Sequence, residues 1–339
     1  MPAHTTVYAR TLIVLAALAT VVALVALPIS STAAPARAQK LEHRLSNHVS
    51  KVAAVKHNTS QPTSLEDAAR YIEAALAGEG YKVRRQEYEH DGHRVRNLEV
   101  SLINTRNNKP PRRIFIVGAH YDSACGAPSA NNNDNDNDNG SGSGTAAVLE
   151  LARMLKGIRL SQGTELKFVF FVNQQRPYIS AEGMGSWQHA RDLRTREQPV
   201  AAALNLETIG DHTSTRNSQR YLPGLEKLYP TQGNFIAFVG TVKSSEMVRK
   251  TLAAFKATSN FPAQGLVSAS YVEGVTWSDH TSYNRHGYPA IMITDTAFLR
   301  YPYYHSTHDT PGKPDYRNMA LMVEGLARVI EGIATPTRM

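Results

Sequence analysis

Short apolar runs of strand length alternate with segments whose apolar residues recur at helical spacing. Apart from Lys167, the run Leu166–Val172 is apolar and mostly β-branched or aromatic, so we expect a strand buried on both faces. Ala201–Leu206 and Ala290–Thr294 have the same character. Thr145–Leu155 and Asn318–Ile333 instead place their apolar residues on one helical face. Buried strands alternating with helices predict an α/β fold, with a sheet covered by helices on both faces.

The first half of the chain adds further elements to this pattern. A helix is predicted to begin at Thr63 and to stop at Gly78, where glycine interrupts the apolar face. Strands are expected at Lys82–Tyr88, Val95–Leu102 and Arg113–Gly118.

Composition excludes several classes of protein. The 339 residues are 42% apolar and 19% charged, which is enough apolar material for a core and excludes a disordered or fibrous chain. A single cysteine, Cys125, cannot form an internal disulfide. The formal net charge of +8 is modest, and no basic run is interleaved with aromatic residues. We therefore expect no nucleic acid partner.

The N-terminal segment has the features of a leader. Thr11–Leu27 is uncharged and follows Arg10, and Ala36–Ala38 offers a cleavage site, so residues 1–38 are predicted to be a secretory signal peptide. The apolar run is long, and an uncleaved membrane anchor is the alternative. Either reading predicts an exported protein, periplasmic or secreted and possibly membrane-anchored, with a membrane partner only if the segment stays uncleaved. Residues 39–62 are expected to form a polar N-terminal arm or an irregular first helix.

Polar side chains follow several of the predicted strands directly. They are His120, Asp122, Gln174, Gln175, Glu207 and Asp295. Because ligands of open α/β sheets bind at the carboxyl ends of the strands, these side chains are expected to converge on one crevice. A histidine with carboxylates from separate strand ends is what a zinc site needs, and Asp122 would be the group that orients His120.

Seven motifs occur in one order along the chain. They are GAHYDS at Gly118–Ser123, DNGSG at Asp138–Gly142, FFVNQQRPY at Phe170–Tyr178, MGS at Met184–Ser186, NLETIG at Asn205–Gly210, SDH at Ser278–His280 and YYHSTHDT at Tyr303–Thr310. Together they resemble the secreted co-catalytic di-zinc aminopeptidases, a family related to glutaminyl cyclases and to the transferrin receptor. The resemblance implies one zinc-peptidase-like domain over residues 63–335, with a central, mostly parallel mixed sheet between helices. It also implies that peptide or protein N-termini are the substrate or ligand.

The resemblance implies a role for each matching residue. The implied metal ligands are His120 and Glu207 on the first zinc, Asp138 bridging both zincs, and His305 on the second. Asp122 would orient His120, and Tyr304 would stabilise the tetrahedral intermediate.

Two family positions differ in this chain. The general base and a ligand of the second zinc are normally a pair of glutamates, and here they are Gln174 and Gln175. An amide cannot take a proton near neutral pH, and acid–base help contributes about 10²–10⁴-fold, so most turnover is expected to be lost. Only Asp138 and Glu207 remain of the family's charge-balancing carboxylates. We expect one zinc to bind well, and a second weakly or not at all, with Gln175 as a weak ligand.

Several assignments stay open at this point. Extra residues before Thr145 leave Asp138, Asp136 and Asp134 as candidates for the bridging ligand. Asp279 and His280 are expected either to line the substrate pocket or to serve as a helix cap and a hydrogen-bonded histidine. Asp295 and Asp309 are expected to be structural anchors, and packing accounts for Tyr301 and Tyr303. His308 is expected to be exposed, although a zinc site that lacks a ligand could recruit it.

Three functions compete on this basis. The first is an exported zinc aminopeptidase-like hydrolase whose chemistry is impaired or absent, or which works with one zinc and another base. The second is a non-catalytic protein that binds peptides or metal on the same fold. The third is acyl transfer of the glutaminyl cyclase kind, which still needs an acid–base carboxylate where Gln174 stands.

Overall fold

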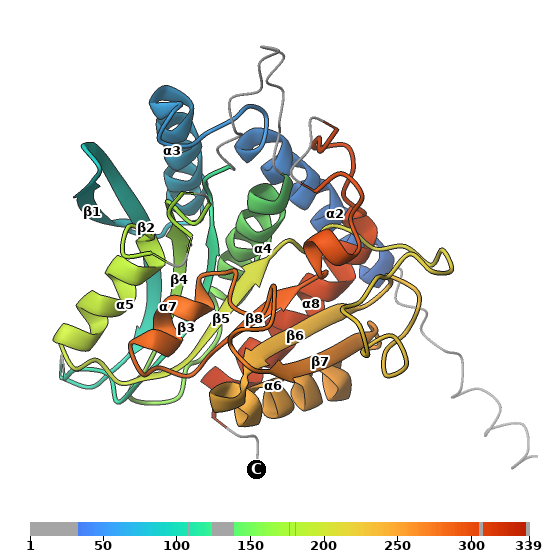
Figure 1. Cartoon of the computed structure of the whole chain (residues 1–339). Coiled ribbons are helices and arrows are strands. Elements are labelled where there is room, and N and C mark those ends of the chain that lie inside the picture. The colour runs from blue at the N-terminus through green and yellow to red at the C-terminus, as the bar shows by residue number, and fades with distance from the viewer. Residues whose placement is uncertain are drawn as a thin grey trace, which may run out of the picture. The chain divides into compact units, whose positions relative to one another are not determined.

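A mixed sheet of eight strands organises the part of the chain that the structure describes (Figure 1). This computed structural model describes residues 33–107, 109–123, 139–175, 177–179, 181–304 and 308–336. The strands are β1 (Arg84–His90), β2 (His93–Asn104), β3 (Arg113–His120), β4 (Thr164–Phe171), β5 (Val200–Glu207), β6 (Ile236–Thr241), β7 (Ala263–Ser268) and β8 (Ala290–Thr294).

The central strands of the sheet run parallel. The strand order is β1-β2-β4-β3-β5-β8-β6-β7. Neighbouring strands from β4 through β3 and β5 to β8 are parallel, as are β6 and β7, while β1, β2 and β6 join their inner neighbours in antiparallel register. The mostly parallel mixed sheet predicted from the sequence is therefore confirmed.

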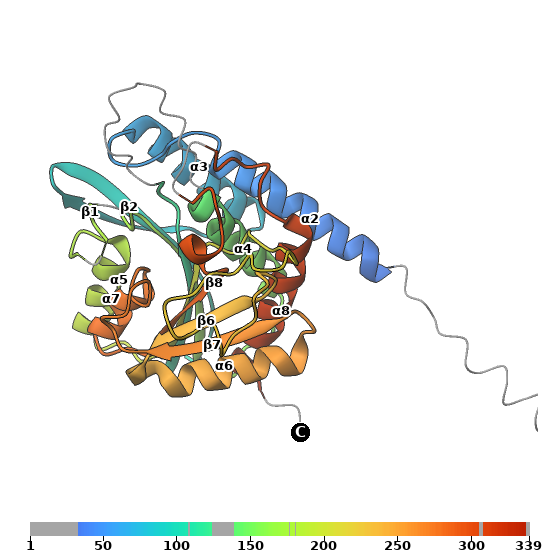
Figure 2. The ribbon, with the colours of Figure 1, turned by 45° about the vertical axis from the view of Figure 1, so that its right-hand side comes forward.

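Helices cover both faces of this sheet (Figures 1 and 2). The helices are α2 (Ala33–Val52), α3 (Pro62–Gly78), α4 (Asn139–Leu155), α5 (Gly185–Thr195), α6 (Ser245–Thr258), α7 (His280–Arg285) and α8 (Tyr316–Ala334), with short 3-10 turns η1 (Val242–Ser244) and η2 (Ala297–Leu299). Side chains of α2, α3, α4, α6 and α8 share one core cluster with the sheet, and side chains of α5 and α7 share another.

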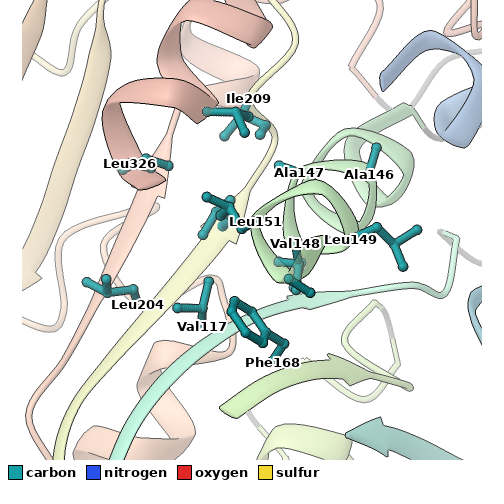
Figure 3. Close-up of a cluster of buried hydrophobic side chains, with 14 of the residues drawn as sticks. Val117, Ala146, Ala147, Val148, Leu149, Leu151, Phe168, Leu204, Ile209 and Leu326 are labelled. Atoms are coloured by element: carbon teal, nitrogen blue, oxygen red, sulfur yellow. The ribbon is translucent and has the colours of Figure 1, made fainter. Parts of the chain in front are cut away.

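Alternation along β4 explains why Phe168–Phe171, in its second half, is apolar at every position. Phe168 and Phe170 point into the α4 and α8 side of the core, whereas Val169 and Phe171 point toward α5 and α7. Successive side chains of a strand face opposite ways, so a strand that packs against a helical layer on each face favours apolar residues at consecutive positions. Figure 3 shows the first of these layers, where α4 side chains pack over β3, β4 and β5.

The segment expected to be an arm or an irregular first helix is a regular helix up to Val52, and residues 53–61 form turns. Most of it belongs to α2, and Leu41, Leu45 and Val49 of this helix are buried in the main core. The chain divides into two compact units, Met1–Arg37 and Ala38–Met339. Of the predicted leader, the structure describes only the first residues of α2, so the apolar run at 11–27 lies outside the described residues. Within the described ranges, no helix is both long and apolar enough to cross a membrane.

A buried glutamate ties α2 to the sheet-covering helix α4. Glu150 of α4 is fully buried, and its Oε1 accepts hydrogen bonds from Arg44 Nε at 2.8 Å and from His48 Nε2 at 3.0 Å. Arg153 binds the other oxygen at 2.8 Å. Burial raises the pKa of Glu150, but the hydrogen bonds and charges of these partners outweigh it and lower the pKa to about 2.

This ion cluster predicts a specific loss of stability in acid. The folded-state pKa of Glu150 lies below that of the unfolded chain, so its stabilising contribution is present above pH about 4.5 and is lost as the pH falls toward about 2. The difference in free energy of unfolding between the native chain and Glu150→Gln should shrink by about 3 kcal/mol over that range. Urea unfolding at several pH values measures it, with exposed Glu331→Gln as control. Parallel curves for the native chain and Glu150→Gln would contradict the prediction.

Candidate metal centre

The candidate site lies at the carboxyl ends of the central strands. His120 is the last residue of β3, and Glu207 is the last residue of β5. These strands are parallel neighbours with Gly118 opposite Asn205, so their ends meet at one edge of the sheet. His120 Nε2 lies 3.4 Å from Glu207 Oε1.

Backbone in the left-handed region sets the direction of the site residues. Asn173, directly before the two glutamines, has φ of 60°, and Thr208, directly after Glu207, has φ of 38°. Asparagine adopts this region readily, whereas it is costly for a β-branched threonine. The Thr208 conformation is held by its neighbours, because its carbonyl accepts from Asp295 N at 2.8 Å and its hydroxyl lies 3.1 Å from that of Thr294.

The His120 ring is oriented with one nitrogen free for a cation. Its Nδ1 donates to the backbone carbonyl of Asp122 at 3.0 Å, which assigns a proton to Nδ1 and directs Nε2 toward Glu207. Nε2 is buried and has no hydrogen-bond partner within the described ranges. Burial lowers the pKa of His120, but the carboxylates of Glu207 and Asp122 outweigh it and raise the pKa well above its ordinary value. An unpartnered imidazole nitrogen that faces a carboxylate fits a metal ligand pair.

Asp122 supports the site in a second way. Its Oδ1 lies 3.6 Å from His120 Nδ1, while the two carboxylate oxygens accept hydrogen bonds from the backbone N–H groups of Gln174 and Gln175 at 3.1 and 3.2 Å. One carboxylate therefore connects the end of β3 to the segment after β4. The sequence predicted that Asp122 orients His120, and the hydrogen bond to the ring comes from the Asp122 backbone carbonyl rather than from its carboxylate. The sequence gave no sign of the contacts between the carboxylate and the backbone.

The Gln174 amide binds Glu207 directly. Its Nε2 donates to Glu207 Oε2 at 3.1 Å and to the Trp277 carbonyl at 3.1 Å. Both partners accept only, so the nitrogen of the amide must point toward them. The hydroxyl of Ser278 donates to the same Glu207 oxygen at 2.9 Å. Gln174 is thus a donor that orients the Glu207 carboxylate, and its buried Oε1 has no partner among the residues described.

Two predicted ligands lie outside the described residues. They are Asp138 and His305, and the alternatives Asp134 and Asp136 lie outside them as well, as does Cys125. The structure therefore brings His120, Asp122, Gln174, Gln175 and Glu207 together and describes neither of the other two ligands. Among the described residues, no group of three or more His, Cys, Asp or Glu side chains could hold a metal ion.

Of the two residues left open in the SDH motif, His280 is a hydrogen-bonded histidine, whereas the Asp279 side chain does not cap a helix. His280 is fully buried and donates from Nε2 to the Val275 carbonyl at 2.9 Å, and burial lowers its pKa to about 4. It is a neutral, hydrogen-bonded histidine. Asp279 is also buried, and its carboxylate makes no capping bond to α7. Neither of its oxygens has a hydrogen-bond partner in the described part of the chain, and burial raises its pKa to about 7.

The predicted structural residues anchor the neighbouring loops. Asp295 accepts from the backbone N–H groups of Asp211 at 2.8 Å and Ala297 at 2.9 Å. Asp309 is buried and accepts from the Tyr301 hydroxyl at 2.7 Å. Anchoring roles for both aspartates are thus consistent with the sequence analysis.

An apolar pocket of about 100 Å³ adjoins Glu207. Tyr304, the predicted intermediate stabiliser, and Glu207 both line it. Its walls are mostly large apolar side chains, among them Leu222, Phe235, Trp277, Met292 and Phe298. One wall of the pocket is the segment 211–235, which contains no helix or strand. Apolar periodicity detects only helices and strands, so it did not reveal this pocket. The aromatic residues in that segment were the one available signal.

A buried arginine pins this wall. Arg300 donates from Nη1 to the carbonyls of Asp211 at 3.0 Å and Phe235 at 2.9 Å, which are the two ends of the wall segment. Its Nε donates to Gln219 Oε1 at 2.8 Å, and its guanidinium lies 4.6 Å from the centre of the Phe235 ring. The 211–235 segment is therefore fixed at both ends and in its middle.

Comparison with known proteins agrees with this geometry. The chain belongs to peptidase family M28, whose sequence profile matches residues 101–330. It is 32% identical over 268 residues to the uncharacterized protein YfbL of Escherichia coli strain K12, covering 79% of this chain and 80% of that protein.

Solved structures share the fold at low sequence identity. The LapA aminopeptidase of Legionella pneumophila has a TM-score of 0.65 at 16% identity, covering 89% of this chain and 75% of that one. The aminopeptidase from Aneurinibacillus sp. strain AM-1 has a TM-score of 0.64 at 15% identity, covering 88% and 95%. The glutaminyl cyclase of Fimbriiglobus ruber has a TM-score of 0.60 at 20% identity, covering 86% and 94%. The zinc exopeptidase-like fold predicted from the sequence is confirmed.

The Gln174 contacts predict that restoring a glutamate destabilises the metal-free protein. In Gln174→Glu a second carboxylate would face Glu207 Oε2 and the Trp277 carbonyl, where hydrogen bonds now form. In EDTA at pH 7 we expect a loss of about 1–3 kcal/mol in free energy of unfolding, and a larger loss than in Gln174→Met, which removes the bonds without adding charge. Urea unfolding measures both. Equal stability of Gln174→Glu and the native chain would show that the amide has no such role.

Proposed function

We propose that this M28 protein binds the N-terminus of a peptide at a single zinc site and hydrolyses it slowly or not at all. The observation that carries the proposal is the double hydrogen bond of the Gln174 amide to Glu207 and to the Trp277 carbonyl. It assigns an orienting donor to the position where the family has a base. We also propose export, which the uncharged run at Thr11–Leu27 supports.

His120 and Glu207 would hold the zinc, together with Asp138. This assignment is supported by the unpartnered Nε2 of His120, which faces Glu207 at 3.4 Å. Bound zinc would supply acidification of a water molecule and polarisation of a peptide carbonyl. For a second zinc the chain offers His305 and the neutral amide of Gln175 beside the shared Asp138, which leaves too little negative charge for tight binding.

Proton transfer is the step that the residues of this chain do not support. A general base must take a proton from the attacking water and pass it to the leaving amine. Gln174 uses its amide hydrogens to hold Glu207 and the Trp277 carbonyl, and its oxygen is not basic near neutral pH. Gln174 can therefore only orient groups in the site.

The apolar pocket supports recognition of a large uncharged side chain. Trp277, Phe298 and Met292 line the space next to Glu207, so the first side chain of a peptide could enter while its backbone faces the site. Tyr304 lines the same pocket and would contact the peptide carbonyl. Leucine, methionine or phenylalanine at the N-terminus suits these walls best.

A second candidate function is slow turnover with a different base. Asp279 is the favoured residue, because both of its oxygens are buried without a hydrogen-bond partner in the described ranges. If it serves as base, Asp279→Asn should remove the residual activity. If the chain is a binding protein only, this variant should leave peptide binding unchanged.

Restoring the family glutamates should restore turnover. We expect Gln174→Glu/Gln175→Glu, loaded with zinc, to cleave leucine p-nitroanilide about 10²–10⁴-fold faster than the native chain, because a general base is returned to the site. Adding Glu207→Ala to the double variant is the control, and should abolish the gain. A native chain that is as fast as the double variant would refute impaired catalysis.

Metal content gives an independent measurement. After removal of loose metal, elemental analysis should find about one zinc per native chain, close to none in His120→Ala, and a value rising toward two in Gln175→Glu, which adds a charged ligand. His93→Ala, at an exposed histidine, should match the native chain. Two tightly held zincs in the native chain would rule out the single-site proposal.

A further inference from the structure

We propose that the sheet edge opposite the candidate metal centre binds the surface of an anionic phospholipid bilayer. We call this surface the basic edge and define it by Arg106, Lys109, Arg112, Arg113, Arg159, Arg194 and Arg196. This inference is independent of the proposed function.

The strand topology places these residues at the end of the sheet where β3, β4 and β5 begin. β3, β4 and β5 are parallel and start together, because Arg113 pairs with Thr164 and Ile114 pairs with Val200. β2 ends at the same level, with Asn104 opposite Thr164. The turns that lead into these strands therefore lie side by side, toward the bottom of the view in Figure 1, while His120 and Glu207 end the same strands at the other edge.

Most of the net charge of the chain lies on this edge. The segments at this level contain ten Lys and Arg residues and four Asp and Glu residues, a net charge of +6, compared with +8 for the whole chain. These segments are 104–113, 156–164, 192–200, 241–246, 285–290 and 331–336. Because they are separated in the chain, no basic run appears in the sequence.

Six of the seven basic side chains are exposed, Arg113 is half-buried, and most of the seven have no acidic partner within the described ranges. Arg106, Lys109 and Arg159 are exposed and form no ion pair in the described part of the chain. Arg196 does pair with Asp192, at 2.9 Å. Basic residues near helix C-termini stabilise the helix dipole, which accounts for Arg194 at the end of α5. The same reason does not apply to the loop between β2 and β3, which holds Arg106, Lys109 and Arg112, or to Arg113 at the start of β3.

Exposed aliphatic side chains favour a bilayer over a polyanion. Ile103 at the end of β2 is 57% exposed, Val242 after β6 is 66% exposed, and Val267 near the end of β7 is 40% exposed. β6 runs antiparallel to β8 and parallel to β7, so Val242 and Val267 lie at the same edge as the basic residues. Basic residues attract anionic headgroups, and aliphatic side chains gain by entering the interface between headgroups and acyl chains.

Such binding would orient the protein. With the basic edge on the membrane, the carboxyl ends of β3 and β5 would face away from it, and the apolar pocket would stay open to peptides in solution. No membrane-spanning segment is needed for this contact, so it differs from anchoring through the N-terminal segment.

Vesicle binding of charge-matched variants tests the proposal. The protein used in the test consists of residues 38–339, the compact unit that holds the whole sheet and its core clusters. Sedimentation would use phosphatidylcholine vesicles with and without about one third phosphatidylglycerol. We expect binding only to the anionic vesicles, and a loss of about 10-fold or more for Arg106→Ser/Lys109→Ser/Arg159→Ser, since each basic residue near the surface contributes separately. Raising the salt from about 0.05 to about 0.5 M should weaken native binding by a similar factor.

The control removes the same charge elsewhere. Arg216→Ser/Lys227→Ser/Arg317→Ser changes three exposed residues near the opposite edge, and should bind within about twofold of the native chain. Val242→Ser should weaken binding without changing its salt dependence. Equal losses in both triple variants, equal binding to neutral vesicles, or binding to heparin but not to anionic vesicles would each overturn the proposal. Thermal unfolding confirms that each variant is folded.

Discussion

The structure depends on pairing β3 between β4 and β5 while helices cover both faces. This arrangement requires apolar side chains at nearly every position of these strands, and it brings their carboxyl ends to one level. The polar residues of the candidate site lie where the strands end. His120 and Glu207 occupy those positions, and the carboxylate of Asp122 draws in the segment after β4 through two backbone hydrogen bonds. The site is thus a product of strand register.

The sequence predicted the central sheet well because its strands are buried on both sides. It missed β6, although this strand is nearly as buried and apolar as the central ones. It also missed β7, which is only partly buried and whose sequence, with Gln264 and Gly265, lacks a clear period. It predicted the meeting of His120, Gln174 and Glu207 at the strand ends. It could not predict that the Gln174 amide would hold Glu207, since that contact depends on side-chain direction after the left-handed Asn173. The basic edge was equally hidden, because distant turns assemble it.

The groups that surround Gln174 suit an amide side chain. Ser278 and Gln174 both donate to one oxygen of Glu207, so this carboxylate is held by two neutral donors even without a metal. A site built for a glutamate base would instead need a donor or cation facing position 174. The described residues place the Trp277 carbonyl there, which is an acceptor. The groups around position 174 therefore favour an amide over an acid. Glu207, Ser278 and the Trp277 carbonyl all match the glutamine, so the difference from the family involves its neighbours as well.

Arg300, which fixes the 211–235 wall of the pocket, limits which part of that wall can change among related proteins. Arg300 fixes the two ends of the 211–235 segment and, through Gln219, its first half. Residues 222–230 between these points are mostly exposed and carry little of the fold. Replacing residues 222–230 can change the shape of the pocket opening, while the contacts of Arg300 keep Asp211, Gln219 and Phe235 in place. Ligand preference can therefore evolve on a short exchangeable stretch without any change in the sheet or the metal ligands.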